Sequence, residues 1–251
     1  MMPLSADPVT FLAIALALFL GGVVKGATGA GAPVIAVPVI AAFADVRLAV
    51  LVMVVPNVAS NLWQGARYRH ALPPGPMPRL FAAGGAVGAV GGTFLLLTVD
   101  ERALMGAVAV AVLAYVALRA AVPAFRLSPR LVLRLSPWAG LAGGALQGAA
   151  GVSAPVSVSF LNAARLERAA FVATISVYFT VMTAVQMGAQ IVAGLLTGQV
   201  LMLSVAACAP LALGMFTGGH LARHMSAVVF DRAVLAMLSI LALRLGWAAL
   251  S

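Results

Sequence analysis

The sequence predicts an all-α integral membrane protein with two homologous repeats of about four transmembrane elements each, and with Gly/Pro-broken half-helices at the start of each repeat. Composition gives the membrane assignment: 63% of the 251 residues are hydrophobic, 8% are charged, and the mean hydropathy is +1.11. Soluble domains carry about 25% charged residues. A porin-type barrel would show short alternating segments, whereas this chain shows unbroken apolar runs.

The apolar runs define the expected spans, because a helix needs about 20 apolar residues to cross the hydrocarbon core. Two further regions, 9–43 and 136–162, are longer than one span and are interrupted by glycines and proline, so we expect eight elements in all. The first run follows Asp7 without a basic segment, which favours a retained helix over a signal peptide. The uninterrupted candidates are 47–66, 78–97, 102–122, 168–194, 198–222 and 227–249.

A repeated motif divides the chain. Residues 21–34 align with residues 143–156 at a constant offset of 122, with eight of fourteen positions identical. We therefore expect one transporter domain over 1–251, with repeat one over about 9–122 and repeat two over about 136–250. The linker 123–135 between them is basic and is expected to be cytoplasmic.

The glycines of this motif predict a helix break inside the membrane. Broken helices at matching positions of two halves are typical of secondary transporters and mark their binding sites. Proline suits the first turn of a helix, so we expect Pro33 to begin a short helix over 33–43 and Pro155 to begin one over 155–162. Their N-termini would favour an anion.

Lys25 is the only lysine of the chain and lies at the first break. A lysine near the bilayer centre costs at least about 2.5–3.5 kcal/mol on insertion scales, so a bound anion is the simplest compensating partner. The alternative is that Lys25 lies near the surface and extends its ammonium to water. The residues that we expect to bind substrate are Lys25, Gly26, Thr28, Gly29, Gly31, Pro33, Asn57, Gln147, Gly148, Gly151, Ser153 and Pro155.

Several of these polar residues have a second interpretation. The hydroxyls of Thr28 and Ser153 could contact an oxyanion or bond back to their own helix. Asn57, Asn61 and Gln64 share one helix face, as do Gln186 and Gln190, and such amides either line a pore or join helices. We favour a pore-lining role for Asn57, because Pro56 indicates a local kink, and an interfacial position for Gln64. Tyr178 is a weaker candidate, and Gly84, Gly88, Gly214 and Gly218 are expected to pack helices closely.

The segments "GGVVKGATGAGAPVIAVPVI" and "GGALQGAAGVSAPVSVSFLNAARLERAAFVATISVYF" resemble the sulfite exporter TauE/SafE family of membrane permeases. The resemblance implies two homologous halves and the transport of a small sulfur-containing anion, such as sulfite or a sulfonate. It extends over nearly the whole chain in layout, while the motif itself covers about 20 residues per half. The second motif departs from the family pattern at Val152, Ser153 and Ala154, which bears on the substrate.

Other function classes find no support in the sequence. It has no phosphate-binding loop and no paired nucleophile and base, so we expect neither an enzyme nor a cofactor. His220 and His224 lack a third ligand, so no metal site is expected, and the net charge of +9 is attributed to basic loops rather than to nucleic-acid binding. The predicted partners are a small anionic substrate and the lipid bilayer of the bacterial plasma (inner) membrane, with a homodimer as a possible assembly. Export is the expected direction, and a non-transporting membrane scaffold or assembly subunit is the alternative function.

Overall fold

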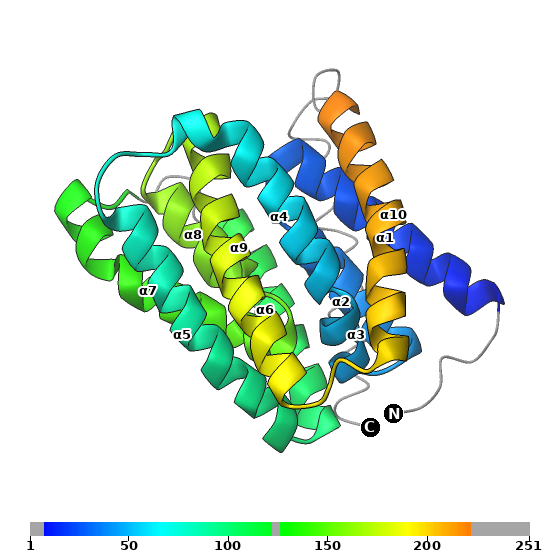
Figure 1. Cartoon of the computed structure of the whole chain (residues 1–251). Helices are drawn as coiled ribbons and strands as arrows, with labels where there is room; N and C mark the ends of the chain where they lie inside the picture. The colour runs from blue at the N-terminus through cyan, green and yellow to red at the C-terminus, as the bar shows by residue number, and fades with distance from the viewer. Residues whose placement is uncertain (1–7, 122–125, 222–251) are drawn as a thin grey trace.

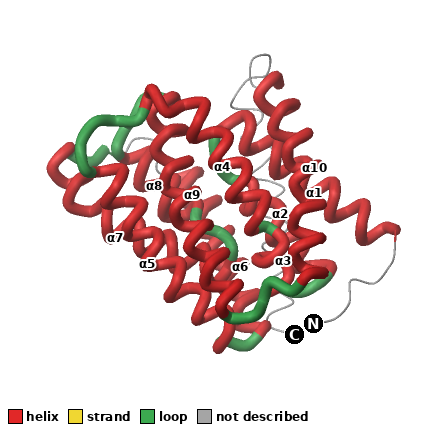
Figure 2. The backbone as a smooth tube through the Cα atoms, viewed as in Figure 1, coloured by secondary structure: helices red, strands yellow, loops and turns green. Residues whose placement is uncertain are grey.

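The computed structural model describes residues 8–121 and 126–221, which are helical apart from short connections and contain no strand (Figure 2). The helices are α1 (Pro8–Thr28), α2 (Ala32–Phe43), α3 (Val46–Val52), α4 (Val54–Tyr68), the 3-10 turn η1 (Arg69–Ala71), α5 (Met77–Thr98), α6 (Glu101–Ala121), α7 (Pro129–Ala150), α8 (Ala154–Ala163), α9 (Arg168–Val192) and α10 (Gly198–Leu221).

The long helices form a bundle with α4 and α9 at its centre (Figure 1). Helices α5 and α7 pack together on one side, and α1 and α10 pack together on the other. In the described part of the chain, five helical segments are long and apolar enough to cross a membrane: Pro8–Thr28, Val46–Ala71, Met77–Thr98, Arg168–Val192 and Gly198–Leu221. The predicted all-helical class is therefore confirmed, and the helices fit a multi-pass membrane protein.

Most expected spans coincide with helices, but two ranges need correction. The span 47–66 is divided at Met53 into α3 and α4, and residues 129–135 of the expected linker belong to α7. The interrupted region 9–43 consists of α1 and α2, and 136–162 falls within α7 and α8. The expected span 227–249 lies outside the described residues.

Pro56 explains the division at Met53. Proline has no N–H, so the carbonyl four residues earlier, that of Val52, has no partner within the helix. Ser204 of α10 supplies one: its Oγ donates to the Val52 carbonyl oxygen at 2.8 Å and accepts from the Val55 N–H at 3.2 Å. One hydroxyl thus satisfies a donor and an acceptor that the kink exposes.

Glycines bring two pairs of helices into backbone contact. A Cβ added to Gly84 or Gly88 of α5 would overlap a carbonyl oxygen of α7, and one added to Gly214 or Gly218 of α10 would overlap a carbonyl oxygen of α1. Glycines at spacings of four on the partner helices make the reciprocal contacts: Gly140, Gly144 and Gly148 on α7, and Gly22 and Gly26 on α1. The expected close-packing role of Gly84, Gly88, Gly214 and Gly218 is confirmed.

Candidate functional site

Lys25 lies in the last turn of α1 and is 1% exposed. Its Nζ donates to Oδ1 of Asn61 on α4 at 2.6 Å and lies 5.9 Å from the ring centroid of Phe179 on α9. Among the described residues, no carboxylate pairs with this ammonium group. Lys25 is therefore enclosed within the protein, with neutral contacts on both sides.

The breaks after α1 and α7 are closed by similar hydrogen bonds. Gly29 and Gly151 take the left-handed conformation, with φ of 89° and 70°, that glycine adopts readily. The Gly29 N–H donates to the backbone carbonyl of Lys25 at 2.7 Å, and the Gly151 N–H donates to the backbone carbonyl of Gln147 at 2.8 Å. Both N–H groups thus cap their own helices, so in this structure they are not free to bind an anion.

A glutamine reaches each of these two carbonyls from a neighbouring helix. Gln64 Nε2 of α4 donates to the Lys25 carbonyl at 3.5 Å, and Gln186 Nε2 of α9 donates to the Gln147 carbonyl at 3.3 Å. Gln64 is 3% exposed, so its side chain points into the protein rather than outward. Its expected depth at the membrane interface stays a prediction. The amides of Gln64 and Gln186 therefore join helices at the two breaks.

The two candidate hydroxyls have different environments. The Thr28 hydroxyl contacts the backbone carbonyls of Val24 and Ala30, at 2.9 and 2.8 Å. It is thus bonded to its own segment of the chain, as in the alternative to a contact with an oxyanion. The Ser153 hydroxyl lies 3.2 Å from the Tyr178 hydroxyl, which donates to the Gly140 carbonyl at 3.1 Å. Ser153 thus joins a buried hydrogen-bond chain with Tyr178.

The short helices α2 and α8 begin directly after the breaks. Gly31, with φ of 99°, precedes α2, while Ser153, with φ of −93°, precedes α8, so the second break does not need glycine at this position. Pro33 and Pro155 are buried in the first turns, and neither N-terminus is capped by a side chain. The contacts of Lys25 nevertheless run to α4 and α9 rather than to these N-termini.

Three further candidates lie deep in the bundle. A Cβ on Gly26 would overlap the Met215 carbonyl oxygen, and one on Gly148 would crowd the backbone of α5, so close packing explains both glycines. Asn57 is buried on α4, and its backbone carbonyl accepts from Asn61 Nδ2 at 2.7 Å. The backbone of residue 57 therefore holds the Asn61 amide that contacts Lys25, and the pore-lining role of the Asn57 side chain stays a prediction.

The residues expected to bind substrate do not include Phe179, whose ring lies near the Lys25 ammonium group. Phe179 belongs to a cluster in which its ring lies 5.4 Å from Tyr178, while Tyr178 stacks on Phe81 at 4.0 Å. Asn61 was placed on the correct helix face by its spacing but was not selected. No spacing rule singles out Phe179, because its proximity to Lys25 depends on how α9 packs against α1 and α4.

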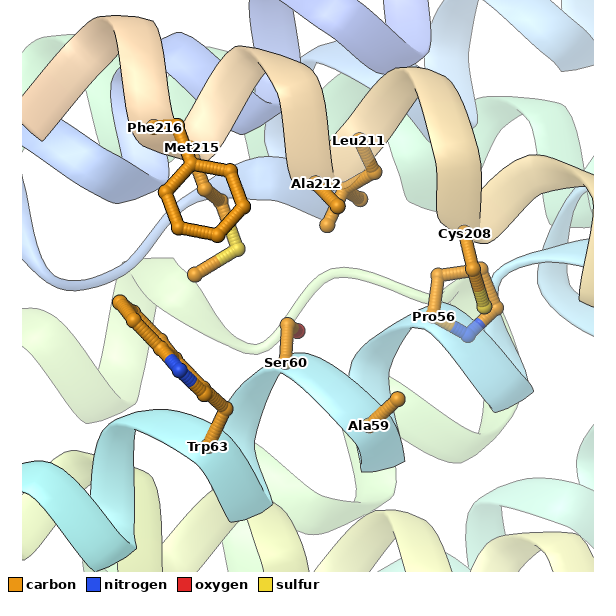
Figure 3. A pocket seen from close by; sticks show the side chains of 9 residues that line it. All are labelled: Pro56, Ala59, Ser60, Trp63, Cys208, Leu211, Ala212, Met215 and Phe216. Atoms are coloured by element: carbon orange, nitrogen blue, oxygen red, sulfur yellow. The ribbon is translucent and has the colours of Figure 1, made fainter.

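A separate cavity of about 170 Å³ lies between α4 and α10 (Figure 3). Its walls are apolar except for Ser60, and its Trp63 and Phe216 rings meet edge to face at 5.8 Å. Cys208 lines the other end and is half-buried. The cavity contains none of the residues expected to bind substrate.

Comparison with known proteins identifies the family. The model of the family described as "Sulfite exporter TauE/SafE" matches residues 14–245, nearly the whole chain. Comparison with curated proteins and with solved structures gave no match. Because this match covers nearly the whole chain, the chain belongs to the sulfite exporter TauE/SafE family of membrane transporters.

Proposed function

We propose that this protein is a secondary transporter that moves a small sulfur-containing anion, such as sulfite or an organosulfonate, out of the bacterial cell across the plasma membrane. Family membership supports the class of cargo. The observation that carries the proposal is Lys25, a buried lysine with a neutral hydrogen-bond partner. An uncompensated buried charge is strongly destabilising, and a bound oxyanion would compensate it and accept from the ammonium group.

The proposal includes two homologous halves with a pseudo-symmetric site. Three pairs of features at the offset of 122 support it: the left-handed glycines Gly29 and Gly151, the short helices that follow them, and the contacts of Gln64 and Gln186 with the carbonyls of residues 25 and 147. The packing of α10 on α1 also parallels that of α5 on α7. Because Gln147 takes the place of Lys25, the second half would contribute no charge to the site.

Export of an anion needs no coupling ion in a cell that is negative inside, since each negative charge gains about 2.3 kcal/mol per 100 mV. Proton-coupled carriers often use a carboxylate in the middle of a membrane-spanning helix. Three acidic residues of the described chain lie instead at helix starts: Asp45, Asp100 and Glu167. We therefore propose uniport-like efflux, and acid-dependent uptake into proteoliposomes would contradict it.

The first experiment is a thermal stability assay of the detergent-purified protein with sulfite, thiosulfate, sulfate, small sulfonates, acetate and chloride. A ligand that binds only the folded state raises the free energy of unfolding by about 2.7 kcal/mol at a concentration of 100 Kd. We expect one sulfur anion to raise the Tm of the wild type and of the exposed-cation control Arg69→Met, but not of Lys25→Met. An equal shift in Lys25→Met would refute the role of Lys25.

A further inference from the structure

Buried polar side chains follow one face of α9. Ser176, Thr183, Gln186 and Gln190 are spaced by seven, three and four residues, which places them on one side of the helix. Each is at most 1% exposed. From Ser176 to Gln190 this face spans about 21 Å at 1.5 Å per residue, roughly two thirds of a hydrocarbon core of about 30 Å.

Helix α4, which packs against α9, also carries a polar face. Asn57, Asn61 and Gln64 share this face and are all buried. Helices α4 and α9 lie side by side and run in opposite directions (Figure 1). A Cβ on Gly65 would lie 3.7 Å from the Ser176 Cβ. One turn further along both helices, Lys25 bridges them: its Nζ contacts Asn61 of α4 and the ring of Phe179 of α9.

Several atoms of these two faces have no hydrogen-bond partner. They are Oε1 of Gln64, Oγ of Ser176 and both amide atoms of Gln190. Leaving a buried polar group unpaired costs about 1–3 kcal/mol, and such groups in native proteins indicate water, an ion or a ligand. The Thr174 hydroxyl is also unpaired, but it lies on another face of α9.

We propose that the interface of these two faces, the α4–α9 polar seam (Asn57, Asn61, Gln64, Ser176, Thr183, Gln186 and Gln190), is the path along which the anion crosses the protein. The Ser176 hydroxyl and the Gln190 amide are hydrogen-bond donors for the oxyanion on either side of Lys25. The Gln64 Oε1 atom accepts from water that accompanies it. This inference rests on the proposed transport function and adds to it the route of the anion and the roles of Ser176, Gln190 and Gln64.

Cysteine accessibility tests the path without requiring knowledge of the substrate. In a Cys208→Ser background, Ser176→Cys and Gln190→Cys are labelled in membrane vesicles with a negatively charged, water-soluble methanethiosulfonate reagent. The matched controls are the neighbours Ile175→Cys, equally buried but apolar, and Ile191→Cys, on the exposed face. We expect both seam cysteines to react roughly tenfold faster than their neighbours, a ratio that corresponds to about 1.4 kcal/mol.

The anion that stabilises the wild type should slow labelling at both seam positions. A sulfonate is used in this arm, because sulfite itself cleaves mixed disulfides. Seam cysteines no more reactive than Ile175→Cys would overturn the path, even if the thermal assay supports anion binding at Lys25. Reactive seam cysteines that no anion protects would support a water-filled path and count against the proposed substrate class.

A second variant separates a path residue from a packing residue. Gln190→Leu removes two unpaired buried amide atoms, so we expect an unchanged or higher Tm. If Gln190 lines the path, efflux from proteoliposomes falls roughly tenfold despite this stability. Undiminished efflux from a stable Gln190→Leu protein would overturn the assignment of Gln190.

Discussion

Replacement of Ser204 by alanine should lower the stability of the protein, because this hydroxyl repairs the helix break at Pro56. The change leaves the Val52 carbonyl and the Val55 N–H without the partners that they have at 2.8 and 3.2 Å. A buried unpaired group costs about 1–3 kcal/mol, while hydrogen bonds between membrane helices average about 0.6 kcal/mol and reach about 1.7 kcal/mol.

These values give an expected loss of about 2 kcal/mol for the two bonds together. For a chain of this length that loss lowers the Tm by roughly 4–8 °C. The assay is thermal unfolding of the purified protein in detergent. Thr217→Ala is the matched control on the same helix, since the Thr217 hydroxyl bonds only to carbonyls of α10 itself.

A double-mutant cycle with Pro56→Ala tests the cause. Alanine at this position restores an N–H that the Val52 carbonyl can accept within the helix. Ser204→Ala should therefore cost about 1 kcal/mol less in the Pro56→Ala background. Equal costs in both backgrounds, or a Ser204→Ala protein as stable as Thr217→Ala, would refute the reasoning.

Two further predictions concern packing within the bundle. Gly88→Leu should prevent folding, because even a Cβ would overlap the Leu141 carbonyl oxygen, whereas Gly91→Leu meets open space and should fold; size-exclusion profiles after purification distinguish the two. Tyr178→Phe keeps the stacked ring but leaves the Gly140 carbonyl without its hydroxyl donor, so the Tm should fall by the equivalent of about 1–2 kcal/mol. A Tyr178→Phe protein as stable as the wild type would show that water replaces the hydroxyl.

The sequence predicted local features well where one residue type determines the backbone. Glycine at residues 29 and 151 ended α1 and α7, because the left-handed conformation is accessible to glycine. Proline at 33 and 155 marked the first turns of α2 and α8. The kink expected from Pro56 is present as the division between α3 and α4.

The partner of each candidate residue could not be predicted in this way. The position of Gln64 near a basic loop says nothing of its partner, whereas the fold buries this side chain and directs its amide to the backbone carbonyl of Lys25. Gly26 and Gly148 were expected to approach a ligand, yet the space around them is filled by helix backbone. A short glycine-rich motif fits both uses, and only the neighbouring helix distinguishes them.

The sequence alone determined that this chain is a helical membrane protein of the TauE/SafE type, because hydropathy, helix breaks and the repeated motif are local properties of the chain. The tertiary structure decided that Lys25 faces Asn61 and Phe179 and that α4 packs against α9. These contacts join residues 36 or more positions apart, and they depend on the crossing of packed helices, which no local pattern encodes.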